Sequence, residues 1–239
     1  MIRSWASTAV TRLRGAGPAA AAPVCTAGAL ACVLALGMAT ADAQTRPRHG
    51  KLFAPQDLGL LEGPDRDLWQ SPDQIMDALG IAEGSVVADI GAGGGWFTIR
   101  LARRVGANGI VYAEDIQRQM LEATGRRVAR EGLRNVRTVL GTSEDPRLPA
   151  GALDAVLIVD TYHELENPDA LLRNIAKSLK PQGRVGVVDF KKDGLGPGPA
   201  LEERVDAELI VRDAEGAGLK LLRREAFLPY QFMLVFGRR

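Results

Sequence analysis

The chain has 239 residues, of which 46% are hydrophobic and 25% are charged. This length suits one domain with an appendage, and the composition is typical of a globular protein rather than of a disordered or fibrous one. The formal net charge of +1 disfavours a nucleic-acid partner held by a broad basic surface.

The first 43 residues form a segment that differs from the rest of the chain. A start with three arginines is followed by an uncharged, Ala-rich run at 27–39 and by an A-x-A pattern that ends at Ala43. This three-part layout is that of a secretory signal peptide, with cleavage expected after Ala43. The apolar run is short for a membrane span. We therefore expect a periplasmic or secreted protein without a stable span after cleavage, and an uncleaved anchor is the alternative.

Residues 44–70 carry few periodic signals and are expected to form an extended N-terminal arm that leads to a domain at 71–239. The domain begins with a helix, because Ser71-Pro72-Asp73 combines an N-cap residue, a proline at the first helical position and an acid in the first turn. Gly80 is expected to end this helix.

From residue 85 onward, apolar strands alternate with amphipathic helices. Strands are expected at 86–88, 110–113, 136–140, 155–159 and 185–188. Helices are expected at 97–105, 120–128, 167–179 and 201–209. This alternation predicts an α/β fold with a parallel sheet and helices on both faces. Two last strand-like runs, at 219–223 and 232–236, predict a C-terminal antiparallel hairpin because a proline-containing connection joins them.

The first strand runs into a glycine-rich turn, Asp89-Ile-Gly91-Ala-Gly93-Gly94-Gly95-Trp96. Glycine lets a ligand approach the backbone, and the following helix offers unpaired N–H groups. A P-loop is excluded because the Gly-Lys-Ser/Thr sequence is absent. A dinucleotide fingerprint is disfavoured because it needs a small residue where Trp96 stands.

The pattern D-x-G-x-G-x-G resembles the first motif of the class I S-adenosylmethionine (SAM)-dependent methyltransferases. The resemblance extends over residues 66–239 and includes the run Leu179-Lys-Pro-Gln-Gly-Arg184 before the fifth strand. It implies a Rossmann-like, seven-stranded, mostly parallel sheet. It also implies that Asp89 lies near the methionine ammonium of SAM, and that the glycines let SAM pass over the turn: Gly91, Gly93 and Gly95.

The second and third strands end in further candidate cofactor residues. A carboxylate at the end of the second strand can accept bonds from both ribose hydroxyls, and Asp115 is the first candidate, with Glu114 the second. The family often has Gly-Asp after its third strand, where the Asp contacts the adenine amine. This chain has Gly-Thr-Ser143-Glu144 instead, so Ser143 and Glu144 are the candidates for that contact.

The loop after the fourth strand reads Asp160-Thr-Tyr-His163-Glu164 and faces the reacting end of the cofactor in such a fold. Methyl transfer mainly requires alignment of donor and acceptor, and a base helps where the acceptor loses a proton. Asp160 and His163 are therefore the candidate catalytic residues, although Asp160 is also a candidate brace for the loop. No metal site is expected, because His163 and Glu164 lack a third ligand nearby.

The sequence thus predicts an enzyme that transfers a methyl group from SAM to a small-molecule or lipid acceptor, with the N-terminal arm able to close over the cofactor. A catalytically silent binding protein with the same fold is the alternative that the signal peptide favours, because SAM is made in the cytoplasm. A nicotinamide-dependent reductase is a further alternative, which Trp96 weakens.

Overall fold

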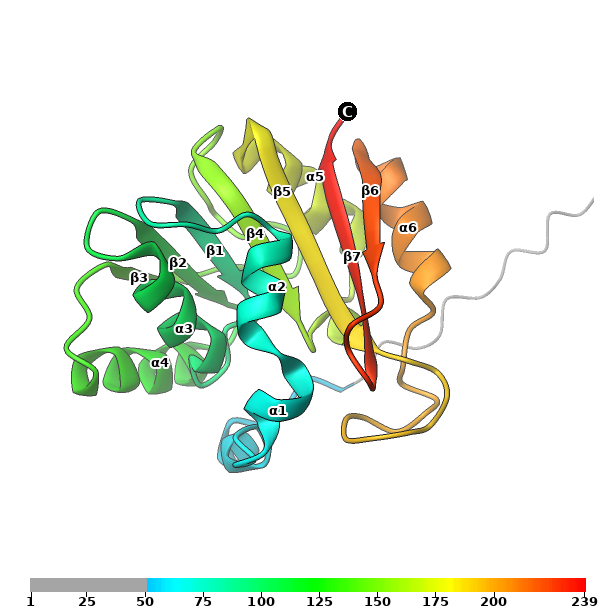
Figure 1. The fold of residues 1–239 in the computed structure, drawn as a ribbon, viewed down its shortest axis with the longest axis horizontal. Coiled ribbons are helices and arrows are strands. Elements are labelled where there is room, and N and C mark those ends of the chain that lie inside the picture. Colours follow the sequence, from blue (N-terminus) through cyan, green and yellow to red (C-terminus); the bar gives the residue numbers. More distant parts are fainter. Residues whose placement is uncertain (1–50) are drawn as a thin grey trace, which may run out of the picture. The chain divides into compact units, whose positions relative to one another are not determined.

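Seven strands form one sheet in the order β3-β2-β1-β4-β5-β7-β6 (Figure 1). The computed structural model describes residues 51–239, so the predicted signal peptide and the start of the predicted arm lie outside the described residues. Strands β1 to β5 pair in parallel, and β7 is antiparallel to both β5 and β6. The strands are β1 (Val86–Ile90), β2 (Ile110–Asp115), β3 (Val136–Leu140), β4 (Leu153–Val159), β5 (Leu179–Phe190), β6 (Leu219–Glu225) and β7 (Gln231–Arg238). The predicted fold class is confirmed, including the C-terminal hairpin.

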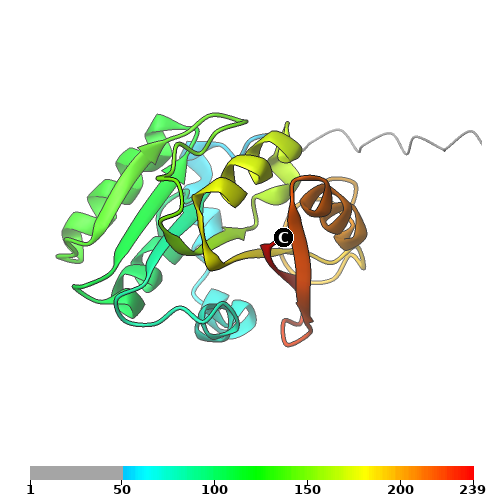
Figure 2. The same cartoon turned by 90° about the horizontal axis from the view of Figure 1, so that it is seen from above.

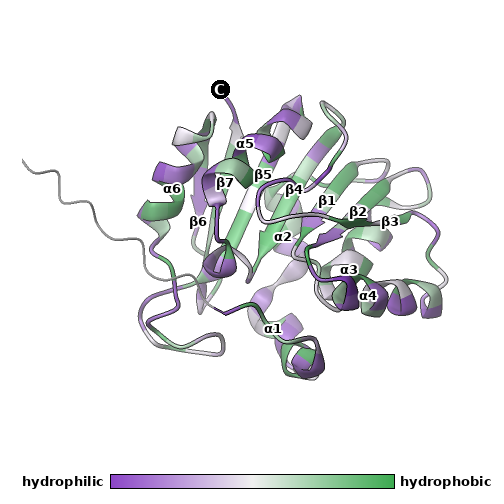
Figure 3. Cartoon of the chain, turned by 180° about the vertical axis from the view of Figure 1, so that it is seen from behind, coloured by the Kyte–Doolittle hydropathy of each residue, from purple (hydrophilic) through white to green (hydrophobic). Residues whose placement is uncertain are grey.

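Helices cover both faces of the sheet (Figures 1 and 2). Apolar side chains of α2 and α3 pack on one face, and those of α5 and α6 pack on the other. The strands between them are largely hydrophobic, whereas the helices turn hydrophilic residues outward (Figure 3), as expected for a sheet buried on both sides. The helices are α2 (Pro72–Ala78), α3 (Trp96–Val105), α4 (Arg118–Arg130), α5 (Pro168–Ser178) and α6 (Ala207–Gly216).

The fifth strand begins at Leu179 rather than at 185 as predicted, so the run at 179–184 is part of β5. Leu179 pairs with Leu153 before the register shifts. Gly183 is required at this irregularity, because a Cβ there would lie 2.7 Å from the carbonyl oxygen of Leu153.

The helix predicted at 201–209 starts later than expected. α6 begins only after Asp206, whose carboxylate accepts a hydrogen bond from the backbone N–H of Glu208. The preceding segment is held instead by Arg204, whose guanidinium donates to backbone carbonyls of the loop at 191–199. Of the apolar residues that predicted a helix here, Val205 is buried and Leu201 is 47% exposed, so their spacing did not correspond to one buried helix face.

The described part of the N-terminal arm is helical rather than extended. It contains the 3₁₀ helix η1 (Pro55–Leu61) and the short helix α1 (Arg66–Gln70). Ser71 joins α1 to α2 in a left-handed conformation with φ 45°, and its hydroxyl makes no capping bond. Ser71 thus occupies the predicted N-cap position and α2 begins at Pro72 as expected, but the side-chain cap is not formed. No helix in residues 51–239 is long and apolar enough to cross a membrane.

Candidate active site

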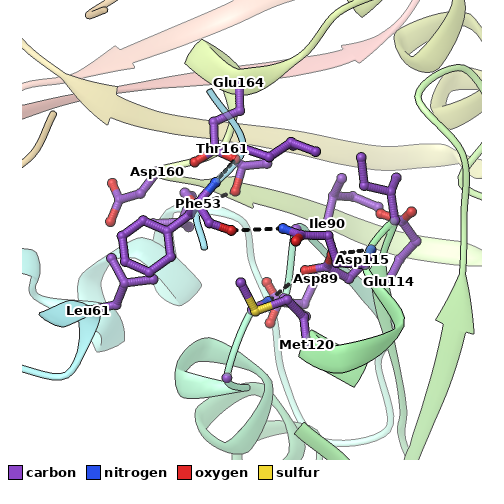
Figure 4. Close-up of a pocket in the computed structure, with 18 of the residues that line it drawn as sticks. Phe53, Leu61, Asp89, Ile90, Glu114, Asp115, Met120, Asp160, Thr161 and Glu164 are labelled. Atoms are coloured by element: carbon purple, nitrogen blue, oxygen red, sulfur yellow. Dashed lines mark hydrogen bonds between the residues drawn. The ribbon is translucent and has the colours of Figure 1, made fainter. Parts of the chain in front are cut away.

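A cavity opens at the carboxyl ends of the parallel strands, beside the point where the strand order reverses between β1 and β4. Its volume is about 1100 Å³, including the part that is open to solvent. Figure 4 shows carboxylates of β1 and β2 on one side of this first cavity and Asp160, Phe53 and Leu61 on the other. Most of the site residues predicted from the sequence line this cavity.

The glycine-rich turn forms the floor of the first cavity. Gly91 has φ 68°, and a Cβ there would lie 2.4 Å from the side chain of Thr161. Gly93 has φ 54° and donates its N–H to Asp115 Oδ2 at 3.0 Å. Only residues without a side chain adopt this path at no steric cost. The turn thus presents bare backbone to a ligand.

Gly95 differs from Gly91 and Gly93 in its surroundings. It does not line the first cavity. Its φ is 81°, and a Cβ there would lie 3.1 Å from the side chain of Thr124 on α4. Gly95 therefore lets α3 begin close to α4, which is a packing requirement.

Asp89 ends on the wall of the first cavity as a buried carboxylate. Its Oδ2 accepts a hydrogen bond of 2.6 Å from Thr98 Oγ1. Burial raises the pKa of Asp89 to about 6, against the opposing effects of Thr98 and Arg66. A cationic ligand would restore the charged form, because an opposite charge nearby favours ionisation.

Asp115 and Glu114 both line the first cavity but have different partners. Asp115 accepts backbone N–H bonds from Gly93 at 3.0 Å and Gln117 at 2.8 Å. Glu114 is 2% exposed, and its Oε1 has no hydrogen-bond partner within the described structure. Burial, followed by the neighbouring Asp115, raises the pKa of Glu114 to about 8.

Asp160 is tied by three side chains. Arg66 donates to its Oδ2 at 3.1 Å and Gln70 at 3.0 Å, and Gln231 donates to its Oδ1. The residue has φ 54°, a conformation that costs energy for a residue with a Cβ. With these donors in place, the geometry favours the bracing role of Asp160 over that of a free base.

His163 lies in a second cavity and is paired with Asp189. Its Nδ1 is 3.1 Å from Asp189 Oδ1, and its backbone N–H donates to Asp189 Oδ2 at 3.2 Å. Burial opposes protonation of the ring, but the hydrogen bond and charge of Asp189 prevail and raise the pKa of His163 to about 9. The sequence analysis missed Asp189, although an acid at the end of an apolar strand was the signal that had marked Asp89.

The two cavities adjoin and share several lining residues: Phe53, Leu61, Arg66, Asp160 and Glu164. An aromatic cluster forms a wall of the second cavity, with the ring centre of Trp69 6.1 Å from that of Phe190 and 6.3 Å from that of Tyr230. Because the two cavities share lining residues, Asp160 among them, a molecule in the second cavity would lie next to one in the first.

Comparisons with known proteins agree with this geometry. A family model described as a methyltransferase domain matches residues 87–183. A SAM-dependent methyltransferase from Aquifex aeolicus has the same fold, with a TM-score of 0.75 and 28% sequence identity over 78% of this chain and 100% of its own. Residues 87–183 thus form a methyltransferase domain, in a fold shared with class I SAM-dependent methyltransferases. SAM is the cofactor of this family.

Two relatives of known activity are methyltransferases. Nocamycin O-methyltransferase of Saccharothrix syringae is 32% identical over 130 residues, which cover 54% of this chain and 45% of that protein. Ubiquinone/menaquinone biosynthesis C-methyltransferase UbiE of Pasteurella multocida is 35% identical over 128 residues, 51% of this chain and 46% of that protein. The chain thus spans less than half the length of each.

The first cavity of this methyltransferase fits SAM. Gly91 and Gly93 line the cavity beside Asp89; a Cβ at Gly93 would meet nothing closer than Leu58 at 3.9 Å, whereas the space over Gly91 is filled by Thr161. Glu114 also lines the cavity, but its Oε1, unpartnered among the described residues, is buried and lies against Gly141. A cofactor with an ammonium, ribose hydroxyls and an adenine amine supplies donors for Asp89, Asp115 and Ser143, which line the same cavity.

The two candidates for the adenine contact in the loop after β3, Ser143 and Glu144, differ in position. Ser143 lines the first cavity together with Thr142, which the sequence analysis did not single out. Glu144 does not line it, and its Oε1 accepts a hydrogen bond of 2.9 Å from Asn167 Nδ2. The predicted cofactor role of Glu144 is therefore not supported by its position, because its carboxylate joins this loop to the start of α5.

The arm lies over the first cavity. The backbone of Phe53 donates to Glu164 Oε2 at 3.2 Å and accepts from Gln117 Nε2 at 3.0 Å. Glu62 pairs with Arg127 of α4. These contacts link the arm to both sides of the cavity, as expected for a segment that closes over the cofactor. No group of side chains in residues 51–239 has the composition of a metal site.

Proposed function

We propose that the chain transfers a methyl group from SAM, bound in the first cavity, to a small-molecule or lipid acceptor bound in the second, with His163 as the base. The observation that carries this proposal is the position of His163. It lines the second cavity and not the first, with Asp189 bonded to its Nδ1. A base for the acceptor belongs on the acceptor side.

Residues of the first cavity are proposed to hold SAM. Asp89 would pair with the ammonium, and Asp115 and Glu114 would accept from the ribose hydroxyls. Ser143 lies where the adenine amine would donate. When bound, SAM supplies an electrophilic methyl group and leaves as S-adenosylhomocysteine. The protein contributes chiefly alignment and exclusion of water, which the arm provides by closing over the cavity.

His163 is proposed to remove the acceptor's proton. Because Nδ1 faces Asp189, the neutral ring carries its proton there and leaves Nε2 as the acceptor atom. Asp189 positions the ring and stabilises the imidazolium that forms. The relatives are named as an O- and a C-methyltransferase, and a base serves either reaction where the attacked atom must lose a proton.

The proposal is tested with His163→Gln in two assays. Binding of S-adenosylhomocysteine, measured by calorimetry, is expected to change less than twofold, because His163 does not line the first cavity. Methyl transfer from radiolabelled SAM into a small-molecule and lipid extract is expected to fall about 10²- to 10⁴-fold, the usual contribution of a general base. Binding without transfer by the unaltered protein would instead support the silent version of the fold.

We also propose that the protein acts outside the cytoplasm, on the strength of the signal-peptide layout at 1–43. Cell fractionation combined with mass spectrometry of the N-terminal peptide tests this. A mature protein that starts at Gln44 in the exported fraction is expected, and a full-length cytoplasmic protein would contradict the proposal.

A further inference from the structure

The second cavity is a formed binding site whose ligand the fold does not specify. Its walls are predominantly apolar, with a few polar groups around His163, and this is the usual composition of a small-molecule site. The apolar and aromatic lining residues are Phe53, Leu60, Leu61, Leu68, Trp69, Phe190, Pro197, Pro199, Pro229 and Tyr230. The chemistry of this lining restricts the acceptor in three respects.

The first restriction concerns charge. The buried ionisable groups that line the cavity are already paired within the protein: Arg66 with Asp160 at 3.1 Å and His163 with Asp189 at 3.1 Å. Glu164 accepts from the Phe53 backbone at 3.2 Å, and burial raises its pKa. A charged acceptor would therefore enter without a free buried counter-charge, at a high desolvation cost. The site favours an uncharged molecule.

The second restriction concerns shape. Phe190 is 44° from the plane of Trp69, and Tyr230 is 61° from it. Rings arranged in this way offer both a face and an edge to the ring of a ligand at ordinary aromatic separations. All three line the cavity that contains His163. The wall therefore suits a planar ring that presents a hydroxyl group to His163.

The third restriction concerns the mouth of the cavity. Leu60 and Leu68 are 79% and 84% exposed, the highest values for large hydrophobic side chains among the described residues, and both line this cavity. Leu195, 62% exposed, lies in the loop that supplies Pro197 and Pro199. Apolar side chains gathered at a pocket mouth mark an interaction site rather than chance exposure.

We propose that the second cavity binds an uncharged hydroxyaromatic compound with an apolar chain, its ring against the aromatic wall and its chain along Leu60 and Leu68. This rests on the proposed function only for the role of His163. In the reaction the hydroxyl proton passes to His163 Nε2 and the oxygen forms a bond to the methyl carbon. The S–CH₃ bond breaks with its electron pair on sulfur, and the products are an aryl methyl ether and S-adenosylhomocysteine.

The test measures binding of 4-alkylphenols to the full chain saturated with S-adenosylhomocysteine, so that no turnover is needed. The dissociation constant is expected to fall about fourfold for each methylene added from ethyl to hexyl, the value for a CH₂ group removed from water. 4-Hexylbenzoate, which is charged, and hexanol, which has no ring, are expected to bind at least tenfold more weakly than 4-hexylphenol. Equal or tighter binding of either compound would overturn the assignment.

Variants test where the apolar chain of the ligand lies. Leu60→Ser combined with Leu68→Ser is expected to abolish most of the gain per methylene while leaving the affinity for phenol unchanged. Leu222→Ser, an exposed leucine of β6, is the matched control and is expected to change neither quantity. An unchanged gain in the double variant would contradict the proposed path of the chain.

The outcome separates this inference from the proposed function. Alkylphenols that bind as expected but are not methylated would refute catalysis and leave the binding class intact. Methylation of an acceptor of another class, with no alkylphenol binding, would refute this inference and leave the proposed function intact.

Discussion

His163 Nδ1 lies 3.1 Å from Asp189 Oδ1, so the end of β5 and the loop after β4 share a buried carboxylate–imidazole pair. His163 lines the second cavity, and its Nε2 is 3.8 Å from Glu164 Oε1. This contact joins the loop that the sequence had marked to a residue that it had not. It also determines when the proposed base is in its active form.

The first prediction concerns the protonation of His163. With a pKa of about 9, the ring is mostly protonated at neutral pH, so the rate of methyl transfer should rise about tenfold per pH unit up to that value. NMR titration should find the same midpoint. In Asp189→Asn the midpoint should fall towards or below the ordinary value near 6.5, because burial then acts without the carboxylate. Glu208→Gln, which changes an exposed residue at the start of α6, should leave the midpoint near 9.

The second prediction concerns the stability contributed by Glu114. Its pKa is raised to about 8 from 4.5, so between these pH values the unfolded chain loses the proton while the folded protein keeps it. Stability should therefore decrease as pH rises from about 4.5 to about 8. Asp89 and His163, whose pKa values are also raised, keep part of this dependence in Glu114→Gln, but the part due to Glu114 should be lost, so the variant should gain most over the unaltered protein at pH 8. Thermal unfolding of the cofactor-free protein at pH 5 and pH 8 measures this, and equal shifts at both values would contradict it.

The third prediction concerns the ammonium contact of Asp89. Asp89→Asn should weaken the binding of S-adenosylhomocysteine about ten- to hundredfold, the usual effect of losing one charged hydrogen-bond partner. Calorimetry measures the dissociation constant. Asp154→Asn is the matched control, because Asp154 pairs with Lys180 near the start of β4 and should leave binding unchanged. Normal binding by Asp89→Asn would refute the assignment.

The fourth prediction compares two glycines with similar backbone angles. Gly91→Ala and Gly151→Ala both place a Cβ at positive φ, 68° and 62°, but only at position 91 would it meet a side chain, that of Thr161 at 2.4 Å. Gly151→Ala should cost about 1 kcal/mol of stability, and Gly91→Ala clearly more. Denaturant unfolding gives both values. Equal losses would show that strain alone, rather than the close approach of the Asp160 loop, requires Gly91.

The sequence predicted the order of strands and helices along the chain because apolar periodicity and glycine or proline breaks are local signals. It also predicted that Asp89, Asp115 and the Asp160 loop lie together, because they stand at the carboxyl ends of strands that meet at one edge of the sheet. It could not predict Gly95 against Thr124, because that contact joins two helices. It missed the Asp189–His163 pair because that contact is also non-local: the partners are brought together only by the pairing of β4 with β5.

The last prediction concerns Arg66, which connects the arm to the site. Its guanidinium donates to Leu61 O, Gln70 and Asp160 and stacks over the ring of Trp96, 4.2 Å from its centre. Lysine lacks the planar group that makes these contacts together. In Arg66→Lys, S-adenosylhomocysteine should therefore dissociate about tenfold faster, and hydrogen exchange of the arm should accelerate.

Arg103→Lys is the matched control for this substitution, because Arg103 is exposed and pairs with Glu131 on the protein surface. It should leave both the dissociation rate and the exchange of the arm unchanged, since a surface pair of this kind contributes little. If Arg66→Lys accelerated hydrogen exchange throughout the sheet as well, Arg66 would support the whole fold. Acceleration confined to residues 51–70 would instead show that Arg66 holds the arm closed over the cofactor, with Asp160 as its anchor.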